Sequence, residues 1–138
     1  MLVGFPLSFC SSIHIGGALC TTSTKRLILL AQLKHALGKH ALEEENAIYP
    51  AMRQHGLLAE SYTLHAEHGY VKQYLYKLTD LVKDNDAFQL KLANFRRDIE
   101  THMRDEEHDL FPRLKLALEK ADGDYLARRM NQEGLKLA

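Results

Sequence analysis

Two eleven-residue stretches of this chain repeat one another, and each carries a histidine and a glutamate four residues apart. Residues 40–50 and 102–112 align without a gap, acidic on acidic, aliphatic on aliphatic, aromatic on aromatic and proline on proline. On an α-helix, residues four apart lie on one face, one turn above the other. The pairs His40/Glu44 and His102/Glu106 therefore have the spacing of two ligands for one metal ion.

Three long amphipathic helices are predicted to position these pairs. Apolar residues recur at steps of three and four within about residues 24–55, 57–83 and 87–120. Each His-Glu pair lies on the apolar stripe of its helix, and His68 occupies a stripe position of the middle helix where an aliphatic residue is expected. A single such pair is usually a solvated surface pair. Two pairs on core stripes instead indicate a buried metal site, because buried polar groups need a hydrogen bond or a cation.

Helical geometry selects among the neighbouring acids. At about 100° per residue, Glu44 lies about 40° from His40 around the helix axis, whereas Glu45 lies about 140° away. The same argument favours Glu106 over Glu107 as a ligand. We therefore expect Glu44 and Glu106 to face the metal.

Other residues near the motifs receive secondary roles. Glu43 and Asp105 are candidate partners that orient the imidazole rings. His65 lies about 60° from His68 around the same helix and is expected at the rim of the site, as a less certain ligand. The remaining histidines of the helical region are expected on the surface: His35, His55 and His108.

The ligand types indicate the metal. Imidazole and carboxylate without thiolate disfavour structural zinc and fit iron or manganese, and a set of two histidines and one carboxylate with open positions is typical of non-haem Fe(II) that meets O₂. Helical bundles also hold two ions bridged by shared carboxylates. The sequence thus predicts two non-haem iron ions, with manganese or zinc less favoured.

Composition excludes several classes of protein. A chain of 138 residues fits one domain, and 18 basic against 18 acidic residues give no overall field for nucleic acid or an anionic membrane. The two cysteines, Cys10 and Cys20, lie outside the repeats and support no disulfide framework. We expect a cytoplasmic protein that binds neither nucleic acid nor membrane.

Three regions are expected along the chain. Residues 1–24 carry no charged side chain, and their apolar run is too interrupted for a secretory signal or a membrane span. Residues 25–121 form the metal-binding helical domain, which Asp122-Gly123-Asp124 is expected to end, and residues 122–138 form a tail or short peripheral helix. Pro50 and Pro112 lie inside helical patterns, where each is expected to bend or end its helix.

The doubled motif, with Glu67-His68 between its copies, resembles the hemerythrin-like domain, also called the HHE cation-binding domain. The resemblance covers about residues 27–120. It implies an all-α, up-and-down four-helix bundle around a non-haem di-iron centre. Five residues match the ligand pattern of the family: His40, Glu44, His68, His102 and Glu106. Glu107 takes the place of the acid in the family's His-x₄-Asp variant, so a local helix distortion would bring it to the metal instead.

The chain departs from the family pattern in its N-terminal segment. The family's first helix is amphipathic and carries a ligand histidine, whereas residues 1–24 hold only His14, in a Ser/Gly context. Either His14 is a ligand in a divergent first helix, or the segment is foreign to the domain, so that the first helix is incomplete and one ligand is missing. In the second case another copy of the chain would complete the bundle as a homo-oligomer.

The resemblance implies a protein that binds or senses O₂ or a related diatomic such as NO. Iron handling and repair of damaged iron centres are the alternatives within the family, so an enzymatic role is less favoured but open. A metal-free helical interaction module, in which the His and Glu side chains pair with each other, is the alternative outside it.

Overall fold

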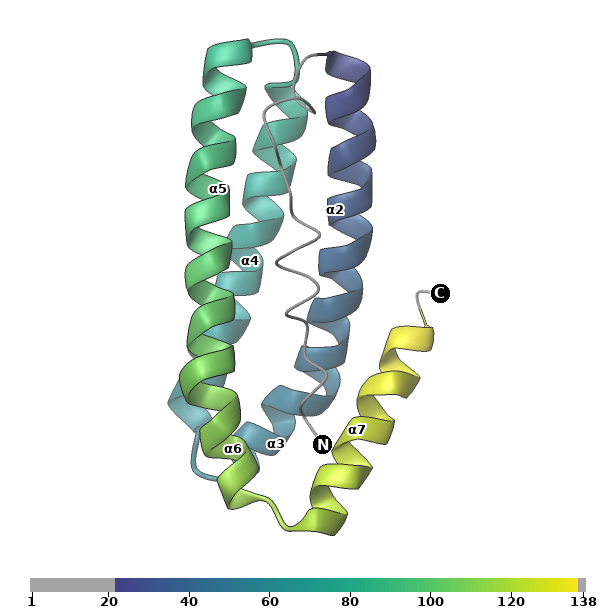
Figure 1. The fold of residues 1–138 in the computed structure, drawn as a ribbon, viewed down its shortest axis with the longest axis vertical. Helices are drawn as coiled ribbons and strands as arrows, with labels where there is room; N and C mark the ends of the chain where they lie inside the picture. Colours follow the sequence, from purple (N-terminus) through teal and green to yellow (C-terminus); the bar gives the residue numbers. More distant parts are fainter. Residues whose placement is uncertain (1–21, 137–138) are drawn as a thin grey trace.

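The computed structural model describes residues 22–136, and within them every regular element is helical. Successive long helices run in opposite directions, so that α2, α4 and α5 stand side by side and α7 returns along the lower part of α2 (Figure 1). This is an all-α bundle. The α-helices are α2 (Ser23–Glu43), α3 (Tyr49–Gln54), α4 (Leu58–Asp80), α5 (Asn85–Asp105), α6 (Phe111–Ala117) and α7 (Lys120–Leu135).

Local signals set the ends of these helices. The side chain of Thr22 caps α2 by accepting the Lys25 amide at 3.2 Å, and Asp84 caps α5 by accepting the Ala87 amide. Gly56 ends the first arm with a φ of 83°, a conformation that glycine adopts at little cost. These stops turn the chain back on itself and bring the two repeats into one bundle.

The predicted stripes form the core, which has two apolar clusters. The upper cluster joins α2, α4 and α5, and the lower cluster joins η2, α3, α4, η3, α6 and α7. The motif residues His40, His68 and His102 come between these clusters along their helices. The polar residues therefore form a layer inside an otherwise apolar core.

Each proline follows a widened helical turn. The helix continues through both sites, but the turns before Pro50 and Pro112 are π-helical, as the segments η2 (Glu44–Ile48) and η3 (Glu106–Leu110). A proline ring clashes with the carbonyl four residues back and lacks an amide hydrogen, and a wider turn relieves this conflict. The prolines thus neither end their helices nor leave them regular.

The C-terminal part of the chain differs from the prediction. The third helical arm ends at Ala117, and Asp122 and Gly123 lie inside the first turns of α7 rather than at a helix stop. The helix is also not peripheral, because Leu126 and Met130 are buried in the lower cluster. Sequence periodicity was weak here because α7 buries only a narrow stripe. The fourth wall of the lower bundle is therefore α7, a partner that the sequence did not indicate.

Leu126→Ala is expected to lower the free energy of unfolding by about 2–4 kcal/mol, because it removes a side chain that is 4 % exposed. Leu135→Ala on the same helix is the matched control, since Leu135 is 72 % exposed and should cost less than about 0.5 kcal/mol. Urea unfolding followed by circular dichroism measures both. Equal, small effects would show that α7 does not stabilise the bundle.

The structure does not describe residues 1–21, so His14, Cys10 and Cys20 lie outside the described residues, as does the predicted first helix. Within residues 22–136, none of the helices is both long and apolar enough to span a membrane.

Candidate metal centre

Four buried residues from three helical arms converge between the two apolar clusters. Glu44 opens η2, His68 comes from α4, and His102 and Glu106 come from α5 and η3. One ligand atom from each of these four lies within 4.8 Å of the others. All four side chains are buried, with Glu44 fully so. Residues up to 62 positions apart in the chain are thus close enough to hold a metal ion.

His40 lies at the edge of this cluster. Its Nε2 is 2.9 Å from Oε1 of Glu44 and 4.0 Å from Oε2 of Glu106, and its side chain is 13 % exposed. The second repeat has the same contact, because Nε2 of His102 is 3.0 Å from Oε1 of Glu106. In each repeat the histidine and the glutamate meet because they are four residues apart on a helix. The five residues singled out from the sequence are therefore together in the structure.

Buried atoms without hydrogen bonds test whether these residues fit a metal. Both carboxylate oxygens of Glu44 and Nε2 of His102 are buried with no hydrogen-bond partner among residues 22–136. Imidazole nitrogens of His40 and His68 nevertheless lie 2.9 and 3.4 Å from Glu44 Oε1. Leaving such atoms unsatisfied is costly, and a cation among them would satisfy them at once. The donor set fits a metal ion.

Two outer carboxylates hold the imidazole rings. Oε1 of Glu45 is 3.1 Å from Nδ1 of His68, and Glu67 pairs with Nδ1 of His102. A carboxylate on Nδ1 fixes the tautomer in which Nε2 offers its lone pair to a metal. The structure corrects the sequence prediction here, because Glu45 and Glu67 take the role expected of Glu43 and Asp105.

The correction has a geometric cause. The angle around a helix axis relates only residues on the same helix. The two carboxylate–imidazole contacts instead join different helices, one between η2 and α4 and the other between α4 and α5. Glu43 instead lies against α7, where a Cβ built on Gly134 would meet its Oε1. Asp105 is exposed.

The less certain candidates lie apart from the cluster. His65 has a side chain that is 59 % exposed, and its Nε2 is 3.8 Å from Oε1 of Glu45. Glu107 is outside the group of four, although its Oε1 is buried without a hydrogen-bond partner in the described part of the chain. A helix distortion is present at this point, as η3, yet Glu106 rather than Glu107 joins the cluster. His35 and His108 are exposed, as expected.

Tyr49 is a site residue that the sequence reasoning missed. Its hydroxyl donates a hydrogen bond of 2.8 Å to Oε1 of Glu106 and lies 3.0 Å from Nε2 of His68. In a regular α-helix, Tyr49 would lie about 140° from Glu44 around the axis. The π turn, closed by the Tyr49 amide on the Glu44 carbonyl, brings it round to the ligand face. The available signal was Pro50, which marks a distortion directly after Tyr49.

The comparisons with known proteins agree with this arrangement. The family model of the hemerythrin HHE cation-binding domain matches residues 14–133. The chain belongs to the hemerythrin family. The matched range covers α7 as far as Glu133, and the four clustered residues lie well inside it. Neither the search of curated proteins nor the search of solved structures finds a match.

The two glutamates of this hemerythrin domain differ in charge state. Burial opposes ionisation of Glu44, but the positive charge of His40 outweighs it and holds the Glu44 pKa well below its usual range. Burial and the negative charge of Glu44 together raise the pKa of Glu106 to about 7. Two carboxylates this close cannot both ionise cheaply without a cation between them.

The histidines respond to the same charges. Burial alone would lower the pKa of His102, but Glu106 and Glu67 reverse this and raise it to about 9. The pKa of His40 is raised in the same way, with Glu44 outweighing burial. Without a metal, protons on the histidines therefore balance the carboxylates.

A mostly apolar cavity of about 220 Å³ adjoins the centre of the hemerythrin domain. It lies among α2, α4 and α5, and three of its lining residues are His40, His68 and His102. The other walls are largely aliphatic, including Val71 and Ile99. The cavity gives a small apolar molecule a place beside the histidine ligands.

Proposed function

We propose that this hemerythrin-family protein holds two non-haem iron ions and binds O₂ or a related diatomic such as NO. The observation that carries the proposal is the convergence of four buried residues: Glu44, His68, His102 and Glu106. Within residues 22–136, both oxygens of Glu44 and Nε2 of His102 have no hydrogen-bond partner. Two carboxylates and three imidazoles without thiolate are a donor set suited to iron that meets O₂. The bound iron supplies the position at which the diatomic binds.

The repeat favours two ions over one. Each arm contributes its own His-Glu pair, and the two glutamates lie close enough to share the cluster. Both oxygens of Glu44 are without hydrogen bonds among the described residues, so this carboxylate is available to two ions at once. In this proposal His40 and His102 bind different ions, and Glu45 and Glu67 keep the rings of His68 and His102 in place.

The apolar cavity supports a diatomic ligand. Two lysines, Lys34 and Lys72, line the cavity, but its other side chains beside the histidines are mostly aliphatic. An uncharged gas enters such a cavity at little cost. With two cysteines in 138 residues, the sequence favours a cytoplasmic location.

Metal analysis and one set of spectra test the proposal. Purified protein is expected to contain iron, or to take up two Fe(II) per chain under argon, and its visible spectrum should change on adding O₂ and revert when O₂ is removed. A spectrum that changes irreversibly, with release of Fe(III), would favour iron handling or repair instead. Protein that binds neither Fe(II) nor Mn(II) would support the metal-free interaction module.

Gly38→Leu is expected to slow NO binding to the ferrous protein several-fold without unfolding it. Gly38 lines the cavity, and a Cβ built there meets nothing within 4 Å. Removing a helix glycine should even stabilise the fold, by about 0.5–1 kcal/mol. Stopped-flow absorbance measures the rate.

Gly69→Leu is the matched control for this substitution. Gly69 is also helical, also has no atom within 4 Å of a built Cβ, and lies outside the cavity. The same rate in both variants would show that the ligand reaches the iron by another route.

A further inference from the structure

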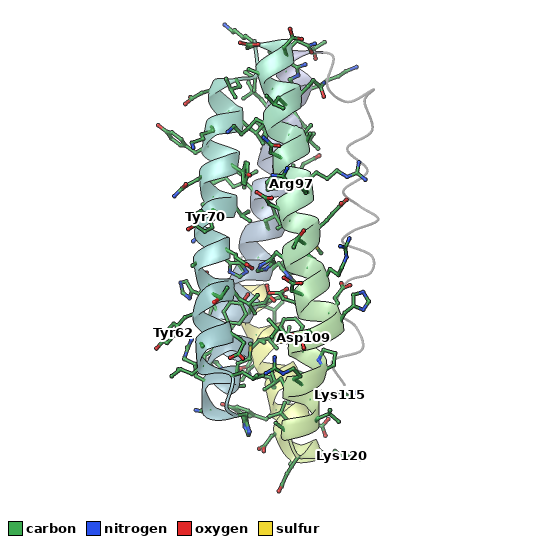
Figure 2. The ribbon with its side chains drawn as sticks, turned by 90° about the vertical axis from the view of Figure 1, so that its left-hand side faces the viewer. Tyr62, Tyr70, Arg97, Asp109, Lys115 and Lys120 are labelled. Atoms are coloured by element: carbon green, nitrogen blue, oxygen red, sulfur yellow. The ribbon has the colours of Figure 1, made fainter. Side chains whose placement is uncertain are left out.

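Tyr49 differs from the other five tyrosines in where its hydroxyl lies. Tyr62 and Tyr70 on α4 project away from the bundle (Figure 2) and are 59 % and 61 % exposed. Tyr49 has no exposed surface, and its hydroxyl is placed between two residues of the candidate metal centre. A buried phenol needs a partner for its hydroxyl, and here that partner is the carboxylate of Glu106.

The repeat shows that this contact exists in one half of the centre only. Tyr49 closes the π turn that begins at Glu44, and Phe111 closes the π turn that begins at Glu106. Phe111 is buried like Tyr49 but has no hydroxyl. Glu106 therefore accepts a hydrogen bond from the opposite repeat, whereas neither oxygen of Glu44 has a hydrogen-bond partner among residues 22–136.

We propose that Tyr49 is a positioning residue that makes the two carboxylates of the centre unequal. Its hydroxyl holds Glu106 in one orientation, whereas no tyrosine hydroxyl among residues 22–136 holds Glu44, whose Oε1 faces the imidazoles of His40 and His68. The inference rests on the proposed function, because it assigns roles within that metal centre.

The chemistry of the contact supports these roles. A carboxylate oxygen has two lone pairs, so Glu106 Oε1 accepts from Tyr49 with one and keeps the other for a metal. The donated proton also draws charge from this oxygen and opposes its rotation. Glu44 has no such hydroxyl contact among residues 22–136, and its Oε1 instead lies 2.9 Å from Nε2 of His40.

Tyr49→Phe tests the proposal, with Co(II) as the probe because its absorption reports ligand number and geometry. The variant keeps the ring and removes one oxygen, so the packing of the lower cluster is retained. We expect the affinity for Co(II) to fall about 10- to 100-fold, as for loss of other groups that orient metal ligands. We also expect the visible Co(II) spectrum of the saturated variant to differ from that of the unchanged protein.

Tyr74→Phe is the matched control. Tyr74 also donates its hydroxyl to a carboxylate, that of Asp98, but this pair, on α4 and α5, is outside the group of four. Its loss should leave both the Co(II) affinity and the spectrum unchanged. A merely structural hydroxyl at position 49 would lower the melting temperature without altering the spectrum of the saturated protein.

Three results would overturn the inference. An unchanged Co(II) affinity and spectrum in Tyr49→Phe would show that the hydroxyl does not position Glu106. A tyrosinate-to-iron absorption band in the ferric protein that disappears in Tyr49→Phe would make Tyr49 a ligand rather than a positioning residue. Absence of Co(II), Fe(II) and Mn(II) binding in the unchanged protein would refute the proposed function and this inference with it.

Discussion

Glu106→Gln lowers the affinity for Fe(II) or Mn(II) by more than about 100-fold, whereas Glu107→Gln changes it by less than about threefold. Glu106 is buried, lies 3.0 Å from Nε2 of His102 and belongs to the group of four. The amide keeps the size of the carboxylate but removes the charge that binds the cation. Glu107 lies next in the chain and outside the group, so it is an adjacent control of the same chemistry.

Competition against a fluorescent chelator measures both affinities, and circular dichroism checks that both variants fold. The metal-free form of Glu106→Gln should remain folded, since the substitution removes a group whose ionisation the buried site disfavours. A larger loss in Glu107→Gln than in Glu106→Gln would contradict the assignment. It would mean that η3 rearranges when metal binds and brings the buried oxygen of Glu107 to the ion.

Removing the metal should lower the melting temperature by about 10–20 °C, because ligand at 1,000 times its dissociation constant contributes about 4 kcal/mol. The unfolded chain cannot hold His40, His68 and Glu106 around one point, so binding stabilises the folded state alone. Differential scanning calorimetry with and without chelator measures the shift. Equal midpoints, in protein shown beforehand to contain metal, would contradict a site within the core.

The decrease in melting temperature on removing the metal should become larger as the pH rises. In the metal-free protein, the raised pKa of Glu106, about 7, gives stability that is lost as the pH rises from about 4.5 through 7. The raised pKa of His102, about 9, gives stability that is present below about 6.5 and is lost as the pH rises through 9. The lowered pKa of Glu44 has the opposite effect, because the stability that it contributes is lost as the pH falls. This loss occurs only in acid.

In the metal-loaded protein, the stability that the bound metal contributes should rise with pH. A cation must displace the protons of Glu106 and His102, so its affinity rises with pH over the same interval. Melting curves of the two forms at pH 6 and pH 9 measure the difference, which should be larger at pH 9. A difference that stays constant would show that these groups bind no protons when the metal is absent.

Much of the fold and of the site was predictable because it depends on positions within single helices. The period of 3.6 residues places His102 and Glu106 on the same face as Phe95 and Ile99, and the structure buries all four. The same period distinguishes Glu44 from Glu45 as the residue that faces the bundle interior. The repeat then supplies the second half of the centre without any tertiary information.

The rest depends on distances between helices, which no single-helix pattern contains. The sequence determined three helical arms, their inward faces and the set of His and Glu side chains on them. Only the tertiary structure decided that Glu45 and Glu67 hold the histidine rings and that α7 covers the lower core. It also decided the π turns, since the conflict at Pro50 can be relieved by a kink or a wider turn, and packing selects between them. That selection brought Tyr49 to Glu106, because a turn with one more residue rotates every side chain that follows it.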